Sequence, residues 1–287
     1  MPSQPKPKSK KTVWIVGVGR LGKLVAAAEL QDGNTVRLFD VIPETIRIQR
    51  RVVCVEPDIE AGAPDRTWFT VPDDEIAEVA AQWATAGCAP KMAIHTSGWH
   101  LPDILKPLGG LNTEYLSLHP MKSIQPNNRD QWRDTVVSLC GSPKAVAWAK
   151  GFLKRRHAKP MEVAPEMKRT LHLLSQLVAN IPYVLVESAY QLASRASLPA
   201  DFLQEAILTM MRGSTDIAVT EGVLAATGPI ARGDAQVVHQ SIQELQAYPQ
   251  LQSFYREYAK LLLSQLQTQS PEDSRTAAWK TIKEQLG

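Results

Sequence analysis

The sequence predicts an α/β domain with a mainly parallel sheet, followed by an all-helical C-terminal domain. From Thr12 to about residue 164, short apolar runs alternate with helical stretches, which is the pattern of βαβ units. The apolar runs are rich in Val, Ile and Leu, as strands buried on both faces of a parallel sheet are. After Pro165 the strand-like runs stop, and segments with helical periodicity continue to the C-terminus. We therefore expect domains at residues 12–164 and 165–287.

The predicted elements follow one another with short connections. Apolar runs predict strands at residues 13–16, 35–39, 52–55, 68–71, 92–95, 115–118, 136–139 and 161–163. Helical periodicity predicts helices at residues 21–30, 74–83 and 145–153. In an open α/β sheet, ligands bind beyond the C-terminal ends of the strands. Residues that directly follow strands are therefore the first candidates for function.

The composition is typical of a soluble globular protein. Hydrophobic residues make up 44% of the 287 residues and charged residues 21%. No apolar run reaches the roughly 18 residues that a membrane-spanning helix needs, so we expect no membrane association. Residues 1–11 contain three Pro and four Lys and lack the apolar segment of a secretory signal. They predict a disordered tail, with a basic partner-binding arm as the alternative.

Charge and cysteine usage narrow the function classes. The net charge of +3 falls to about −1 without the four lysines of residues 1–11, so we expect no nucleic-acid partner. Cys54, Cys88 and Cys140 are far apart and form no CxxC pair. This spacing predicts neither a disulfide framework nor a metal site, and it suits a reducing cytoplasm.

Residues 12–22 combine a strand, a glycine-rich turn and the start of a helix. Gly17, Gly19 and Gly22 form a GxGxxG motif. Gly17 suits the tight turn, Gly19 the close approach of a pyrophosphate, and Gly22 the close packing of helix on strand. The free N–H groups of the helix N-terminus attract phosphate. The motif predicts a Rossmann-type dinucleotide site, whose residues on this loop are Gly17, Val18, Gly19, Arg20, Leu21 and Gly22.

An acidic residue follows the next strand. Asp40 comes 18 residues after Gly22, where a carboxylate accepts hydrogen bonds from the adenosine ribose and repels a 2′-phosphate. We therefore expect NAD rather than NADP. Because Arg37, Arg47 and Arg50 are close in sequence, NADP remains the alternative. An ordinary aspartate at the end of a strand is the other interpretation of Asp40.

The strand at residues 68–71 is followed by an acidic turn. Val71 and Pro72 are expected to flank the cofactor at the C-terminal edge of the sheet. Asp73 or Asp74 is expected to cap the next helix, because an aspartate at that position accepts hydrogen bonds from free N–H groups.

Two further strand ends carry candidates for the chemistry. Ser97 follows the strand at residues 92–95, and His119 ends the strand at residues 115–118. Ser97 could hydrogen-bond a carbonyl or imine substrate, and His119 could pass the proton that accompanies hydride transfer. The alternatives are a turn or helix cap for Ser97 and a packed strand end for His119.

The long helix after Pro165 supplies a third group. Its polar face carries His172, Ser175, Gln176, Ala179, Asn180 and Tyr183, and its other face is apolar. Pro182 cannot donate to the carbonyl of Val178, so we expect a kink near Asn180. His172 is a second candidate proton donor and Asn180 a second substrate ligand. A solvated face is the alternative interpretation.

Taken together, these motifs resemble the bacterial Rossmann-like oxidoreductases in which a nucleotide-binding domain is fused to a helical domain of uncharacterised function. The resemblance spans nearly the whole chain, and its motifs are residues 17–22, 71–76, 95–98, 117–120 and 227–234. The last motif is the most specific, because nucleotide-binding domains in general do not carry it.

This family is similar in turn to pyrroline-5-carboxylate reductase, ketopantoate reductase and the β-hydroxyacid dehydrogenases. The resemblance implies a cytoplasmic NAD(P)-dependent oxidoreductase that acts on a small carbonyl, imine or hydroxy acid in an interdomain cleft, and a homodimer formed through the helical domain. In the β-hydroxyacid dehydrogenases a serine matches Ser97, and a helical lysine precedes an asparagine by four residues. Here Lys168 has His172 at that spacing, so the proton donor stays open between His119 and His172.

Two alternatives to this function follow from the same residues. The segment His119-Pro120-Met121 resembles the corresponding segment of prephenate and arogenate dehydrogenases, although Lys122-Ser123 departs from their pattern. The missing lysine–asparagine pair also fits a non-catalytic nucleotide-sensing protein, because a fold alone does not establish activity.

Arg232 lies in the segment 227–234 and has two interpretations. Its guanidinium could bind a substrate carboxylate with two parallel hydrogen bonds. Alternatively, it pairs with Asp234 or with the end of a helix.

Overall fold

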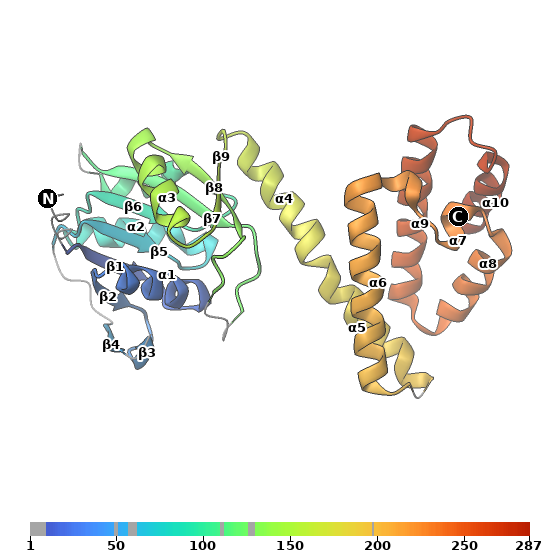
Figure 1. Cartoon of the computed structure of the whole chain (residues 1–287), viewed down its shortest axis with the longest axis horizontal. Helices are drawn as coiled ribbons and strands as arrows, with labels where there is room; N and C mark the ends of the chain where they lie inside the picture. Colours follow the sequence, from blue (N-terminus) through green and yellow to red (C-terminus); the bar gives the residue numbers. More distant parts are fainter. Residues whose placement is uncertain (1–9, 49–50, 57–61, 110–111, 126–129, 197) are drawn as a thin grey trace, which may run out of the picture. The chain divides into compact units, whose positions relative to one another are not determined.

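The computed structural model describes residues 10–48, 51–56, 62–109, 112–125, 130–196 and 198–287. The chain forms two compact units, Met1–Ile181 and Pro182–Gly287 (Figure 1). The sequence places a boundary near residue 164, where the predicted strands end. The first unit extends further because helix α4 (Met167–Ala179) is attached to the sheet through Lys168, whose side chain is buried.

The first unit is built on a sheet in which nine strands are described, in the order β3-β4-β2-β1-β5-β6-β7-β8-β9. Their bounds are β1 Thr12–Val16, β2 Thr35–Phe39, β3 Thr45–Ile48, β4 Arg51–Glu56, β5 Arg66–Phe69, β6 Met92–His95, β7 Glu114–Pro120, β8 Val136–Gly141 and β9 Lys159–Glu162. The pairs β3–β4 and β7–β8 are antiparallel and the other neighbours are parallel. The prediction of a mainly parallel Rossmann-type sheet is confirmed. The strand order reverses between β1 and β5, where such sheets bind their ligands.

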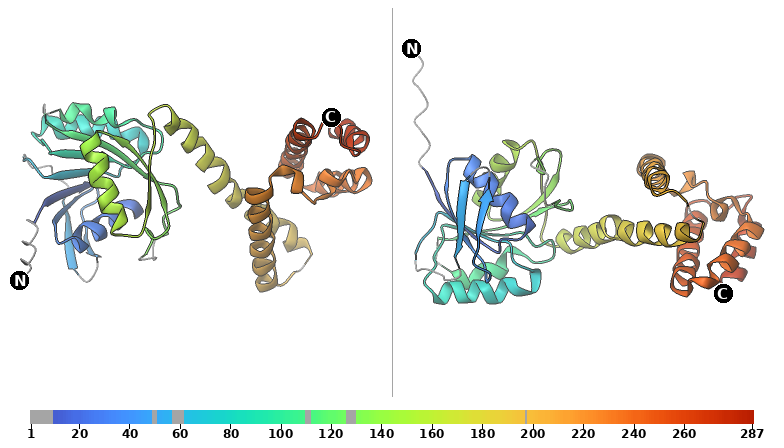
Figure 2. Two further views of the ribbon diagram at one scale, coloured as in Figure 1. Left: turned by 45° about the horizontal axis from the view of Figure 1, so that its top comes forward. Right: turned by 90° about the horizontal axis from the view of Figure 1, so that it is seen from below.

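Alternate residues of the strands build a core on each face of the sheet. Val13 and Ile15 of β1 pack on one face with α1 (Arg20–Gln31) and α3 (Pro143–Lys154). Trp14 and Val16 pack on the other face with α2 (Ile76–Thr85) and the short 3-10 helix η2 (Pro102–Leu108). Figure 2 shows α1 and α3 on one side of the sheet and α2 on the other. This two-sided burial explains why the central strands are almost uniformly apolar.

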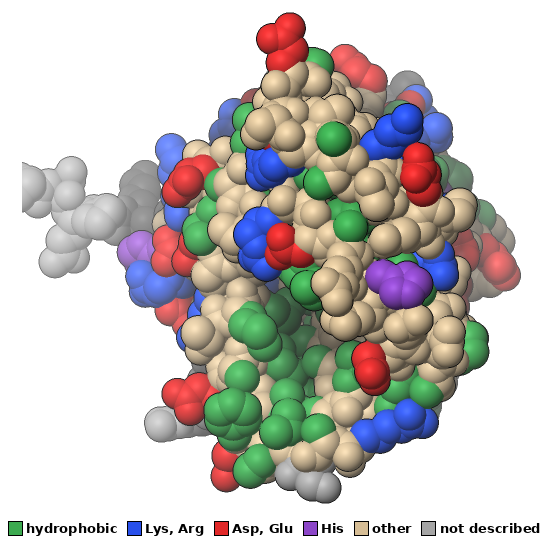
Figure 3. Space-filling view, turned by 90° about the vertical axis from the view of Figure 1, so that its right-hand side faces the viewer, with side chains coloured by type: hydrophobic (Ala, Val, Ile, Leu, Met, Phe, Trp, Pro, Cys, Tyr) green, Lys and Arg blue, Asp and Glu red, His purple; other side chains and the backbone are tan. Residues whose placement is uncertain are grey.

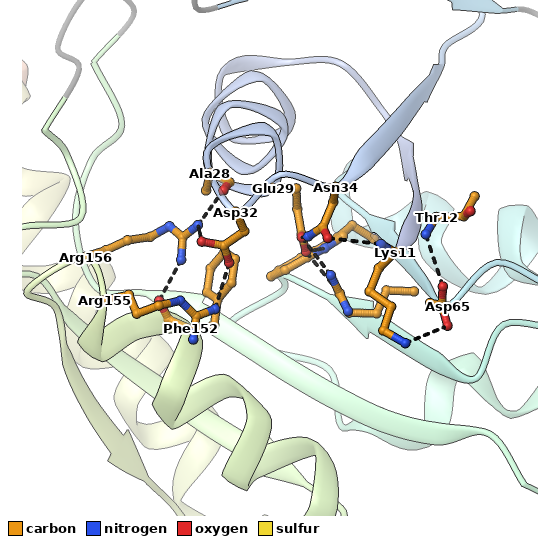
Figure 4. A network of polar contacts seen from close by, with 12 residues as sticks. Lys11, Thr12, Ala28, Glu29, Asp32, Asn34, Asp65, Phe152, Arg155 and Arg156 are labelled. Atoms are coloured by element: carbon orange, nitrogen blue, oxygen red, sulfur yellow. Dashed lines mark hydrogen bonds and ion pairs between the residues drawn. The ribbon is translucent and has the colours of Figure 1, made fainter. Parts of the chain in front are cut away.

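A buried carboxylate attaches α1 to the sheet. Glu29 is fully buried and accepts hydrogen bonds from Arg66 at 2.8 and 3.1 Å, from Trp68 Nε1 at 3.0 Å and from Asn34 at 2.6 Å. Figure 4 shows this group beside a second link, in which Asp32 pairs with Arg155 and Arg156 of the segment after α3. A buried charge is tolerated only when paired and hydrogen-bonded in this way.

Two details of the first unit differ from the predictions. Strand β3 was not predicted, because only Ile46 and Ile48 carry its apolar alternation and it pairs only with β4 at the edge of the sheet. Lys11 was assigned to a disordered tail, but its backbone N–H donates to Asn34 and its carbonyl accepts from Thr35. Residues 1–9 of the predicted tail lie outside the described residues.

The second unit consists, in its described part, of helices. They are α5 (Ile181–Arg195), α6 (Ala200–Glu221), α7 (Pro229–Arg232), α8 (Ala235–Glu244), α9 (Pro249–Gln269) and α10 (Thr276–Leu286), with short 3-10 helices at Val223–Ala225 and Leu245–Ala247. Its apolar core lies among α7 to α10 around Trp279. The expected all-helical region is confirmed, and the kink expected near Asn180 is a break between α4 and α5. None of the described helices combines the length and apolar character needed to cross a membrane.

We predict that Glu29→Ala destabilises the first unit strongly. The substitution leaves the Arg66 guanidinium buried without its carboxylate, which costs about 3–5 kcal/mol. Chemical denaturation followed by tryptophan fluorescence measures the free energy of unfolding. Glu78→Ala, on the exposed face of α2, is the control, and an equal effect of both substitutions would contradict this role of Glu29.

Candidate active site

The glycine loop joins β1 to α1 with contacts too close for side chains. Gly17 has φ +88°, and a β-carbon there would lie 2.8 Å from the backbone of Thr70 and Val71. A β-carbon on Gly22 would lie 2.1 Å from the carbonyl oxygen of Gly17. Gly19 has no atom within 4 Å of its β-carbon position and leaves the N-terminus of α1 open. The loop therefore offers exposed backbone to a ligand.

A cavity of about 810 Å³ lies beside this loop at the C-terminal ends of the strands. Predicted residues that line it are Gly17, Gly19, Arg20, Leu21, Asp40, Val71, Pro72 and His119. Val18 and Gly22 were also predicted to bind the cofactor but do not line the cavity. Gly22 packs behind the loop, and the Val18 side chain is buried. The cavity has the size and position of a dinucleotide site in an open α/β sheet.

Asp40 connects the end of β2 to the glycine loop. One carboxylate oxygen accepts a hydrogen bond from the backbone N–H of Val18 at 2.7 Å, and the other lies 3.4 Å from the N–H of Ile42. Its carboxylate therefore holds the glycine loop in place while the residue lines the cavity. The sequence predicted that Asp40 lies at the cofactor site, but not that its carboxylate holds the glycine loop.

Ser97 is engaged within its own turn. Its hydroxyl donates to Asp73 at 2.6 Å and accepts from the backbone N–H groups of Trp99 and His100 at 3.0 and 3.1 Å. The side chain is buried and does not line the cavity. These contacts match the turn-capping alternative for Ser97. The expected helix cap by Asp73 or Asp74 is wrong: neither the 3-10 helix η1 (Asp73–Glu75) nor α2 after it has a side-chain cap, and Asp73 accepts from Ser97 instead.

His119 lines the cavity at the end of β7. Its Nδ1 lies 3.0 Å from the carbonyl oxygen of Thr96. Because a carbonyl only accepts, Nδ1 carries the proton of the neutral ring and Nε2 is left as an acceptor. Burial lowers the pKa of His119, and the nearby Lys168 and His172 add to this effect. The ring is therefore neutral at pH 7 and suited to accept a proton.

Lys168 is a site residue that the sequence did not select. Its side chain is buried, and Nζ donates to the carbonyl of Ser97 at 3.1 Å and to the hydroxyl of Ser117 at 2.5 Å. Burial lowers the pKa of Lys168 to about 8. Its position one helical turn before His172 places both residues on the same face of α4, which is the signal that could have found it.

The remaining predicted residues fall in different places. His172 packs near His119, with ring centroids 6.1 Å apart. Asn180 is exposed at the end of α4, and its side chain has no hydrogen bond among those described. Arg232 belongs to the second unit, where it donates to Asp234 and to the carbonyl of Thr227. This pairing is one of the two interpretations of Arg232. No group of His, Cys, Asp or Glu in the described residues could hold a metal ion.

Residues 135–262, less than half of the chain, match the model of a domain of unknown function (DUF2520). This match and the structural comparisons confirm the predicted resemblance to a Rossmann-like domain fused to a helical domain of uncharacterised function. A search of curated protein sequences finds no match.

Three solved structures share the fold. A protein from Bacteroides fragilis described as an NADP oxidoreductase has a TM-score of 0.75 at 18% identity, over 88% of this chain and 98% of its own. An imine reductase from Streptomyces aurantiacus has a TM-score of 0.55 at 16% identity, over 95% and 100%. Pyrroline carboxylate reductase from Plasmodium falciparum, with NADP bound, has a TM-score of 0.51 at 12% identity, over 96% and 98%.

We predict that the buried Lys168 leaves a signature in the pH dependence of stability. Between about pH 8 and the ordinary lysine value, the folded chain has lost the Lys168 proton while the unfolded chain still holds it. The free energy of unfolding should therefore rise with pH across this window, by about 3 kcal/mol relative to Lys168→Met. Urea denaturation from pH 7.5 to 10.5 measures it, with the exposed Lys154→Met as control. Parallel curves for wild type and Lys168→Met would contradict the burial of a charged amine.

Proposed function

We propose that this protein is an NAD(P)-dependent oxidoreductase. It moves a hydride between the nicotinamide and a small carbonyl, imine or hydroxy-acid substrate. The observation that carries the proposal is the cavity itself, which is lined by the glycine loop and by His119, whose Nε2 has no described hydrogen-bond donor. The fold shared with oxidoreductases of several substrate classes supports the reaction type.

The cavity residues fit a nicotinamide dinucleotide. Open backbone at Gly19 and the N-terminus of α1 suit the pyrophosphate, and Asp40 suits the adenosine ribose. When bound, the cofactor supplies or accepts the hydride. His119 exchanges the accompanying proton at Nε2. Lys168 holds the backbone carbonyl of Ser97 and the hydroxyl of Ser117 in place. We propose NAD as the preferred cofactor because the Asp40 charge disfavours a 2′-phosphate.

We predict that Asp40→Asn shifts cofactor choice toward NADPH. The amide oxygen can still accept from the Val18 N–H, while the charge that repels a 2′-phosphate is removed. The ratio of the NADH and NADPH dissociation constants should change by about tenfold, which corresponds to about 1.4 kcal/mol. Titration by cofactor fluorescence measures it. Asp74→Asn, an exposed aspartate that does not line the cavity, is the control, and an unchanged ratio for Asp40→Asn would refute the NAD preference.

Turnover is tested with a panel of carbonyl, imine and hydroxy-acid substrates with NADH and NAD, and prephenate and arogenate test the alternative dehydrogenase. His119→Gln should lower kcat by roughly 10²–10⁴-fold with cofactor binding retained. Tight cofactor binding without turnover across the whole panel would favour a nucleotide-sensing protein instead.

We further propose a cytoplasmic homodimer formed through the helical region. Helices α5 and α6 expose large apolar side chains, among them Val184 and Phe202 at 59% and 60%. Figure 3 views the second unit and shows hydrophobic side chains around a hollow on that face. Apolar patches of this kind mark protein interfaces, and a second copy of the chain offers the same surface for a two-fold contact.

We predict that Phe202→Glu converts the dimer to a monomer, because a buried carboxylate at the interface has no partner. Light scattering after size-exclusion chromatography measures the mass. Ile42→Glu changes a similarly exposed apolar residue of the first unit, at 70%, and should leave the dimer intact. A monomeric wild-type protein at micromolar concentration would exclude the proposed dimer.

A further inference from the structure

Two histidines from different elements face the same space beside Gly98. A β-carbon on Gly98 would lie 2.6 Å from Nδ1 of His172 and 3.0 Å from Nε2 of His119. The two ring planes are inclined at 68°, with centroids 6.1 Å apart. His119 comes from β7 and His172 from α4, and both belong to the first unit. A side chain at position 98 would therefore collide with both rings.

Hydrogen-bond partners assign the proton of each neutral ring. The Nδ1–H of His119 donates a hydrogen bond to the Thr96 carbonyl, which leaves a lone pair on Nε2. The side-chain amide nitrogen of Gln176 lies 2.9 Å from Nε2 of His172. An amide nitrogen only donates, so Nε2 of His172 accepts and its proton is on Nδ1. That Nδ1 is buried and has no hydrogen-bond partner among the described residues.

We propose that His172 is a positioning residue that acts through His119: its Nδ1–H lies beside the Nε2 edge of His119 and disfavours a second N–H group there. The inference rests on the proposed function of His119 as the proton-exchanging group.

The charged groups around His119 define the expected direction. Burial lowers the pKa of His119 most, the Thr96 carbonyl raises it, and Lys168 and His172 of α4 lower it. Asp73 of η1 raises it. The ring centroid of Trp99 lies 5.9 Å from that of His172, and the Arg169 guanidinium lies over the Trp99 ring. Removing His172 removes one of the groups that disfavour the charged form of His119, so the pKa of His119 rises.

Nuclear magnetic resonance of the full chain with ¹⁵N-labelled histidine tests the pair without any substrate. In the wild type, both rings should show the Nδ1-protonated tautomer at neutral pH. In His172→Gln, the pKa of His119 should rise, and in the exposed-residue control His239→Gln it should stay unchanged. An unchanged pKa of His119 in His172→Gln, or an Nε2-protonated His172, would overturn the proposal.

Kinetics supply the second readout. The acidic limb of the kcat/KM profile should move to higher pH in His172→Gln, with the KM for cofactor unchanged. Gly98→Ala should lower kcat because its methyl group separates the rings. If the pKa of His119 rises in His172→Gln but no substrate turns over, the proposed function is wrong and the inference about His172 holds. If turnover is seen and the profile of His172→Gln does not move, the pair fails and the function stands.

Discussion

The position of helix α1 on the sheet is the constraint on which the rest of the first unit depends. At its N-terminal end, Gly22 packs against the Gly17 carbonyl at a distance that excludes any side chain. At its C-terminal end, the buried carboxylate of Glu29 is bonded to Arg66 and Trp68 of β5. The helix is thus attached at both ends to strands on either side of the switch in strand order. Its free N-terminus points to the cavity for that reason.

Backbone groups form one end of the proposed site, and side chains form the other. The proposed cofactor end uses backbone, because only N–H groups and small residues allow a pyrophosphate to approach closely. The proposed chemical end uses side chains from β7 and α4, and the buried amine of Lys168 ties the strand ends to that helix. Placing a lysine there depresses the basicity of the neighbouring His119. The residue that holds α4 therefore adds to the effect of burial on the protonation of His119.

Local patterns were sufficient for most of the fold. The parallel strands are recognisable because burial on both faces demands continuous apolar runs, as in β1 and β6. Strand β3 escaped prediction because an edge strand paired with a single neighbour needs little apolar sequence. The break at Asn180 followed from Pro182, since proline cannot donate the helical hydrogen bond.

The sequence by itself determined the nucleotide-binding end of the protein, because a glycine motif, its strand and its helix are contiguous and the physical role of each residue is local. It also named His119 and His172 as candidates. Only the tertiary structure decided which of their nitrogens have hydrogen-bond partners and that both rings lie beside Gly98, because these contacts join residues from separate elements. The same holds for Ser97, whose hydroxyl is occupied by an aspartate 24 positions away, and for the burial of Lys168. Hydrogen-bond partners and desolvation are properties of the packed chain, and no local pattern encodes them.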